Sequence, residues 1–140
     1  QYLHDHGEKH GDIRRDHIII DAETDKFRWI DFDFNYRHRE NIFGYDLFGL
    51  GNILIYLVGK GDVILSDLKK QHFTALEKLN ENDVNIVFRH RVANLKKIYP
   101  YIPTALNLVL LHFSRGANRF YENCRDLLED LAEVLNHHIA

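Results

Sequence analysis

The chain has 140 residues, of which 45% are apolar and 28% are charged, and its net charge is −3. This size suits a single domain with its own core, so residues 1–140 are expected to form one domain. The small negative charge excludes a general surface for nucleic acid or anionic membranes. Cys124 is the only cysteine, so no internal disulfide can form, which favours a reducing compartment such as the cytoplasm.

The predicted elements begin with a short helix and a hairpin. Residues 2–6 are expected to end a helix, with Gly7 as its stop. Two β-rich runs, residues 17–20 and 27–30, flank the turn-forming segment DAETDK. This pattern predicts a short hairpin with a longer loop.

The pattern after residue 45 is helical. Leucines recur at helical spacing until Gly59 and Gly61, and Ser66 is a candidate cap for the next element. The segment around Asp46 and Asn52 is too polar and too short for a membrane span, which needs about 20 apolar residues. Helices are predicted over residues 46–58, 83–98, 104–113 and 121–138, and residues 65–79 are expected to form one or two more. The sequence therefore predicts a mainly α domain with one short β-hairpin, and no doubly wound sheet or barrel.

Two acidic residues lie at the open end of the predicted hairpin. Asp12 precedes the first strand and Asp31 follows the second. Because a hairpin brings its ends together, the two carboxylates should be close in space. Close carboxylates repel each other, so such pairs usually mark a metal site or an acid/base site.

Three segments, HGDIRRDH, WIDFDF and DLFGLG, resemble in this order three motifs of the protein-kinase-like superfamily. They are similar to its catalytic loop, to its metal-binding D-F-G segment and to the start of the central helix of its larger lobe. The H-G-D form of the loop is typical of aminoglycoside- and choline-type small-molecule kinases. The resemblance implies the helical C-terminal lobe of a kinase-like fold, and transfer of the ATP γ-phosphate to a hydroxyl-bearing substrate with Mg²⁺.

The resemblance also implies a role for each matching residue. Asp12 would be the catalytic aspartate, which orients the attacking hydroxyl and accepts its proton. Arg14 would face the phosphates, and Asp31 would hold Mg²⁺. His10 would support the loop, and Asp46 would be a buried acid that accepts hydrogen bonds from the loop backbone.

Two positions depart from the family pattern. His17 stands where the family has a metal-binding Asn, and imidazole is a poor ligand for Mg²⁺. It would contact phosphate, leave a second metal unbound, or mark a degenerate site. Asp33 replaces the glycine of D-F-G, and its carboxylate could serve as a further metal ligand. These departures motivate an alternative function, a pseudokinase-like binding or scaffold module without catalysis.

Several parts of an active protein kinase have no counterpart in the sequence. Only residues 32–45 lie between the two matching aspartates, too few for a long activation segment, which favours the small-molecule branch. The sequence has no Gly-rich loop or strand lysine to clamp ATP, and no methionine. We therefore expect an N-terminal lobe encoded before Gln1 as the partner of this lobe, and no efficient phosphotransfer by this lobe alone.

A zinc-binding helical domain is the third interpretation. His4, His6 and His10 follow the spacing H-x-H-x-x-x-H, which could bring three imidazoles together on a tight loop. The kinase resemblance instead places His4 and His6 at a helix end and its turn, where they would be exposed. Arg91 is expected on a solvated helix face, and Cys124 as a packed thiol.

Overall fold

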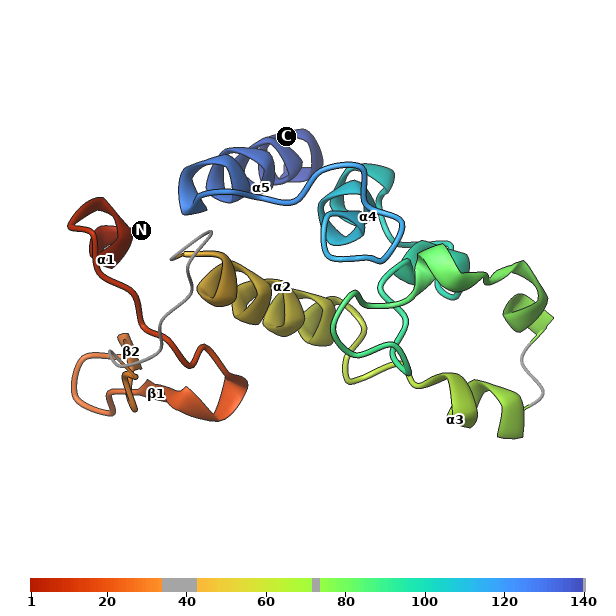
Figure 1. The fold of residues 1–140 in the computed structure, drawn as a ribbon, viewed down its shortest axis with the longest axis horizontal. Coiled ribbons are helices and arrows are strands. Elements are labelled where there is room, and N and C mark those ends of the chain that lie inside the picture. The colour runs from red at the N-terminus through yellow and green to blue at the C-terminus, as the bar shows by residue number, and fades with distance from the viewer. Residues whose placement is uncertain (34–42, 72–73, 140) are drawn as a thin grey trace.

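In a computed structural model, which describes residues 1–33, 43–71 and 74–139, the protein is mainly helical with one antiparallel two-stranded hairpin. This arrangement confirms the predicted secondary-structure class. Helix α2 is central, with α4 and α5 along one side of it and the hairpin near its N-terminal end, while α3 lies beyond its C-terminal end (Figure 1). The helices are α1 (Tyr2–Asp5), α2 (Gly44–Val58), α3 (Leu65–Lys70), α4 (Thr104–Leu111) and α5 (Cys124–Ile139).

The hairpin consists of β1 (Ile18–Ile20) and β2 (Phe27–Trp29), as predicted. Beyond the last strand pair, the backbone N–H of Ile30 donates to the carbonyl of His17 at 2.9 Å. This bond continues the pairing toward the residues that precede β1 and follow β2. This backbone hydrogen bond therefore holds together the two chain segments at the open end of the hairpin.

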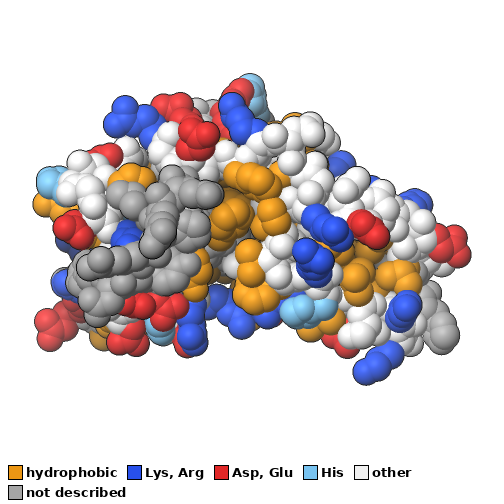
Figure 2. All heavy atoms as spheres, in the orientation of Figure 1, with side chains coloured by type: hydrophobic (Ala, Val, Ile, Leu, Met, Phe, Trp, Pro, Cys, Tyr) orange, Lys and Arg blue, Asp and Glu red, His pale blue; other side chains and the backbone are white. Residues whose placement is uncertain are grey.

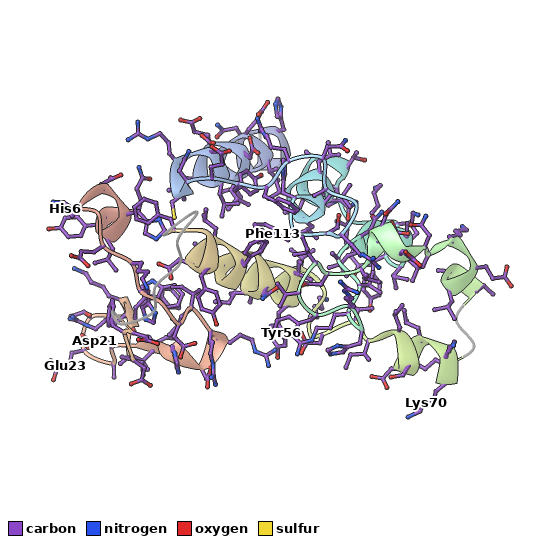
Figure 3. The ribbon with its side chains drawn as sticks, in the orientation of Figure 1. His6, Asp21, Glu23, Tyr56, Lys70 and Phe113 are labelled. Atoms are coloured by element: carbon purple, nitrogen blue, oxygen red, sulfur yellow. The ribbon has the colours of Figure 1, made fainter. Side chains whose placement is uncertain are left out.

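Helix α2 carries apolar residues on two opposite faces, because one face packs in the core and the other lines the site described below. Leu47, Gly51 and Ile55 are spaced by four residues and are buried toward the core. A side chain on Gly51 would overlap the ring of Phe113, so glycine permits close packing here. Figure 3 shows Phe113 on one side of α2 and Tyr56 on the opposite side. Tyr56 belongs to the face that lines the site described below.

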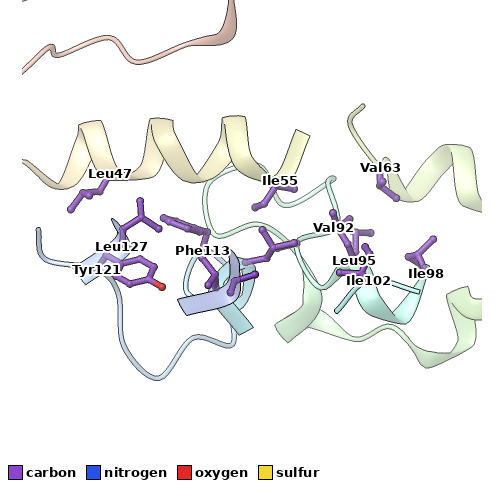
Figure 4. Close-up of a cluster of buried hydrophobic side chains, with 14 of the residues drawn as sticks. Leu47, Ile55, Val63, Val92, Leu95, Ile98, Ile102, Phe113, Tyr121 and Leu127 are labelled. Atoms are coloured by element: carbon purple, nitrogen blue, oxygen red, sulfur yellow. The ribbon is translucent and has the colours of Figure 1, made fainter. Parts of the chain in front are cut away.

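The core joins α2 to the C-terminal half of the chain (Figure 4). Burying one large aliphatic side chain contributes about 1.5–3 kcal/mol, so this cluster fixes α2 firmly against its neighbours. Hydrophobic side chains also gather near the middle of the face shown in Figure 2, where α2 lies in Figure 1. None of the described helices is long and apolar enough to cross a membrane. The buried cluster includes Leu47, Ile55, Val92, Leu95, Ile102, Leu110, Phe113, Tyr121 and Leu127.

The prediction of a helix over residues 83–98 is wrong. The segment contains an extended stretch between two short 3₁₀ turns, in which Val84 pairs with Val92. The Asn85 side chain explains part of the difference, since its Oδ1 accepts hydrogen bonds from the backbone N–H groups of Val87 and Phe88 at 2.9 and 3.0 Å. Such a side-chain turn competes with the helical backbone pattern.

The predicted cap of α3 and the predicted start of α5 also differ from the structure. Helix α3 begins at Leu65, so Ser66 lies inside its first turn and does not cap it. Helix α5 begins at Cys124 rather than at residue 121, because the Asn123 side chain accepts a hydrogen bond from the backbone N–H of Asp126 at 2.9 Å. Asparagine is a favoured residue at this capping position.

Candidate functional site

The loop of residues 10–12 is held by Asp46, a buried carboxylate in the first turn of α2. The backbone N–H groups of His10 and Gly11 and the Nε2 of His4 each donate to it at 2.8 Å. Three donors compensate the cost of burying the carboxylate. The bonds from the loop backbone are those that the kinase resemblance implies, whereas the bond from His4 was not predicted.

His4 is not an exposed residue at a helix end, so that prediction is wrong. Its side chain is 9% exposed and stacks on the ring of Phe43, with the ring centroids 4.2 Å apart. Its Nδ1 lies 3.4 Å from the Sγ of Cys124, the first residue of α5. Burial raises the pKa of the Cys124 thiol, so a protonated sulfur faces this nitrogen. His4 therefore joins α1, α2 and α5 around the acid that holds the loop.

Gly11 occupies a position that no other residue fits. Its φ of +87° lies in the left-handed region, and a Cβ atom there would overlap the carbonyl of Asp33. Asp33 is close because its backbone N–H donates to the carbonyl of His10 at 2.7 Å. The glycine of the H-G-D motif thus allows the segment after β2 to pack against the loop.

Replacing Gly11 with alanine is expected to lower the free energy of unfolding by about 1–3 kcal/mol, because the variant suffers both backbone strain and the overlap with Asp33. Urea denaturation of the two proteins measures this difference. Gly7→Ala is the matched control, since Gly7 has a similar φ of +76° but no atom near a Cβ. Equal losses in the two variants would contradict the proposed role of the close contact.

His10 connects the loop to the second strand. It is 1% exposed, and its Nε2 donates to the carbonyl of Ile30 at 2.7 Å. Its Nδ1 accepts a hydrogen bond from the backbone N–H of Asp12 at 3.1 Å. Because the carbonyl only accepts and the amide only donates, the neutral Nε2–H tautomer satisfies both contacts. His10 thus positions the backbone of Asp12 rather than pointing into a reaction site.

His17 lies between the two predicted acids. It is buried, and its Nδ1 donates to the backbone carbonyl of Asp12 at 2.9 Å. The same Nδ1 lies 3.6 Å from the Asp12 carboxylate, and Nε2 lies 3.6 Å from the Asp31 carboxylate. The structure therefore brings both acids to one imidazole ring, at the end of the hairpin where the sequence predicts them.

Of the side chains around His17, only the carboxylates are of a type that suits Mg²⁺. The Asp31 side chain is 70% exposed, and its hard carboxylate oxygens suit Mg²⁺. His17 offers only an imidazole nitrogen, which Mg²⁺ disfavours. Asp33, also exposed, follows two residues later and supplies a further carboxylate. Asp31 has a φ of +55°, a strained conformation of the kind that clusters at functional sites.

Arg14 forms a two-bond ion pair with Asp16, with Nε and Nη2 lying 3.1 and 2.7 Å from the two carboxylate oxygens. This hydrogen-bonded pair raises the pKa of Arg14 and lowers the pKa of Asp16. Both side chains are more than half exposed, so solvent screens the attraction. The predicted contact of Arg14 with phosphate would require this pair to open.

A cavity of about 820 Å³ adjoins the Asp12 side of the site. The loop lies directly on α2 here, because Gly49 carries no side chain that would overlap the backbone of Ile13. Arg91 also lines the cavity, with a side chain only 30% exposed, so its predicted place on a solvated helix face is wrong. That error follows from the incorrect helix over residues 83–98. Among the lining residues are Asp12, Arg15, Tyr56, Asp62, Phe88 and Arg91.

The three histidines of the zinc interpretation do not converge. His4 bonds to Asp46, and His10 bonds to a strand carbonyl. The Nδ1 of His6 donates instead to the carbonyl of Tyr2 at 2.8 Å. Over the described ranges of the chain, no group of three or more His, Cys, Asp or Glu side chains is arranged to hold a metal ion.

Comparison of the chain with protein-family models, with curated proteins and with solved structures found no match. One carboxylate, Asp12, lies on the wall of a cavity that can admit a small molecule, and a second, Asp31, is open to solvent and to cations.

Proposed function

We propose that this chain is the C-terminal lobe of a kinase-like phosphotransferase of the small-molecule type. The observation that carries the proposal is the placement of Asp12 and Asp31 on either side of His17, with Asp12 lining the cavity. The attachment of the loop to Asp46 supports it, because a reacting carboxylate must be held in a fixed orientation. The acceptor would be a small molecule with a hydroxyl group.

In the proposed reaction, a hydroxyl in the cavity donates a hydrogen bond to the Asp12 carboxylate. Its oxygen attacks the γ-phosphorus of ATP and its proton passes to Asp12 as the new O–P bond forms. The bond between the γ-phosphorus and the bridging oxygen breaks, and ADP leaves. Asp31, with Asp33 beside it, would hold Mg²⁺, which neutralises phosphate charge when bound. We expect a separate N-terminal lobe to clamp the ATP.

Replacing Asp12 with asparagine in the full-length protein is expected to lower kcat at least about 100-fold, the usual contribution of a positioned acid/base group. ADP release with Mg²⁺·ATP and a panel of small hydroxyl compounds measures the effect. Asp67→Asn makes the same chemical change on an exposed side chain of α3 and is the matched control. Equal rates for the wild type and the Asp12 variant would refute the catalytic assignment.

A pseudokinase-like binding or scaffold module is the second candidate. The observation that favours it is the buried ring of His17, which occupies the space between the two acids. Thermal unfolding of the full-length protein with ATP and Mg²⁺ separates the candidates, since a ligand at 100 times its Kd adds about 2.7 kcal/mol of stability. A magnesium-dependent shift supports the phosphotransferase, and its absence supports the scaffold.

A further inference from the structure

The cavity beside Asp12 is lined by three arginines and three aspartates, which are unevenly paired. Arg14 and Asp16 neutralise each other as a two-bond pair at the rim. Asp62 instead faces two arginines, since its carboxylate oxygens lie 3.6 Å from Nη1 of Arg15 and 3.5 Å from Nη1 of Arg91. Both distances exceed those of strong charge-assisted hydrogen bonds. Two guanidinium groups therefore share one carboxylate and keep donors available.

Arg91 has an unused donor inside the protein. Its Nε is buried, and within the described part of the chain this atom has no hydrogen-bond partner. Leaving a buried donor unpaired is unfavourable, and native proteins seldom do so without a reason. A ligand in the cavity would meet Arg91 at the exposed part of its side chain, which is 30% exposed, and not at this enclosed atom.

Aromatic rings hold both arginines at the cavity wall. The guanidinium of Arg15 lies 3.8 Å from the ring centroid of Tyr56, and that of Arg91 lies 4.4 Å from the ring centroid of Phe88. Cation–π contacts of this kind restrict the two side chains, so less conformational entropy is lost when an anion binds. The planar guanidinium group can donate two parallel hydrogen bonds to a pair of oxygens of a carboxylate or a phosphate.

Several of the remaining wall residues are apolar, and Asn52 and Asp12 add polar groups to them. Phe48, Ile53 and Val87 line the cavity together with the ring of Tyr56. These residues offer a surface for hydrocarbon or aromatic groups.

We propose that this cavity binds an acceptor with an apolar or aromatic body and one anionic group, a carboxylate or a phosphate, which Arg15 and Arg91 hold. This inference rests on the proposed function, because it names the class of molecule whose hydroxyl would reach Asp12. It also makes a separate claim about binding, which can be measured without catalysis.

The test uses three probes of similar size with the full-length protein, in the absence of Mg²⁺ and ATP. Phenylacetate and phenyl phosphate carry the two candidate anions, and benzylamine carries the opposite charge. Ligand-observed NMR titration is expected to show at least 10-fold tighter binding of one or both anions than of benzylamine. Binding of phenylacetate alone assigns a carboxylic acid, and binding of phenyl phosphate alone assigns a phosphate ester. Benzylamine binding equal to or tighter than both anions overturns the proposal.

Two variants locate the binding. Arg15→Gln and Arg91→Gln are each expected to weaken the preferred anion at least 10-fold, while Arg89→Gln, an exposed neighbour that does not line the cavity, leaves it unchanged. Arg15 is half exposed, so its variant provides the test even if the Arg91 variant fails to fold. Unchanged affinity in Arg15→Gln overturns the proposal.

The two proposals fail in different ways. Anion binding by a wild-type protein that shows no phosphotransfer, or whose phosphotransfer is unchanged in Asp12→Asn, removes the kinase function and keeps the anion site. Phosphotransfer that depends on Asp12, in a protein that binds neither anion, would refute the anion site and support the kinase-like function.

Discussion

Replacing Asp46 with alanine is expected to lower the free energy of unfolding by about 3–5 kcal/mol. The variant leaves the buried N–H groups of His10 and Gly11 without an acceptor, and each such group costs about 1–3 kcal/mol. It also removes the acceptor of the His4 side chain. The loop that carries Asp12 would then lose its attachment to α2, so phosphotransfer should fall as well.

Urea denaturation measures this loss, and hydrogen exchange at the Gly11 amide reports on the loop itself. Asp46→Asn should cost less, because the amide oxygen can still accept one of the two backbone bonds. Asp67→Ala, on an exposed site, should change stability by no more than about 0.5 kcal/mol. A loss as small as this for Asp46→Ala would show that the buried hydrogen bonds do not hold the loop.

Replacing Asp83 with alanine is the second change with a large expected effect, a loss of about 3 kcal/mol at neutral pH. The side chain is buried and accepts hydrogen bonds from Lys97 Nζ, Asn94 Nδ2 and the Asn80 N–H at 2.7, 2.8 and 2.9 Å. The backbone around Asp83 also organises the segment that carries Arg91, so anion binding in the cavity should weaken.

The contribution of Asp83 should depend on pH in a defined direction. Burial alone would raise its pKa, but the hydrogen bonds from Lys97, Asn80 and Asn94 outweigh burial and lower it below the ordinary 3.8. Since the folded pKa is below the unfolded value, the stabilisation is present above the unfolded pKa and disappears as pH falls through the folded pKa.

Urea denaturation of the wild type and Asp83→Ala at about pH 7 and about pH 3 tests the direction. The difference in the free energy of unfolding should shrink in acid. A difference that is the same at both values would mean that the carboxylate charge contributes nothing.

Elements defined by local patterns were predictable from the sequence. The hairpin follows from two β-rich runs with a turn-forming loop, and α2 from regular apolar spacing that ends at Gly59. The attachment of the loop to Asp46 was also expected, because an acid in so apolar a helix needs hydrogen-bond partners.

The predictions that were wrong concern residues whose structure depends on contacts between segments distant in the sequence. Residues 83–98 read as a helix, but Asn85 bonds to its own neighbours and pairs with Ser114 in an isolated bridge. The role of Arg91 was therefore missed. His4 was missed because its partners, Asp46 and Cys124, are 42 and 120 residues away in the sequence.

The loop of residues 10–15 touches α2 at successive points along its length. Gly11 bonds to Asp46, Ile13 packs on Gly49, and Arg15 lies over Tyr56. A largely irregular segment, which ends in the 3₁₀ turn that begins at Arg15, thus contacts one helix at its start, middle and end. Opening the loop would break contacts at each of these points, so the loop is expected to open less readily than a loop held only at its ends. We therefore expect movement that admits or releases ligands to occur in other elements.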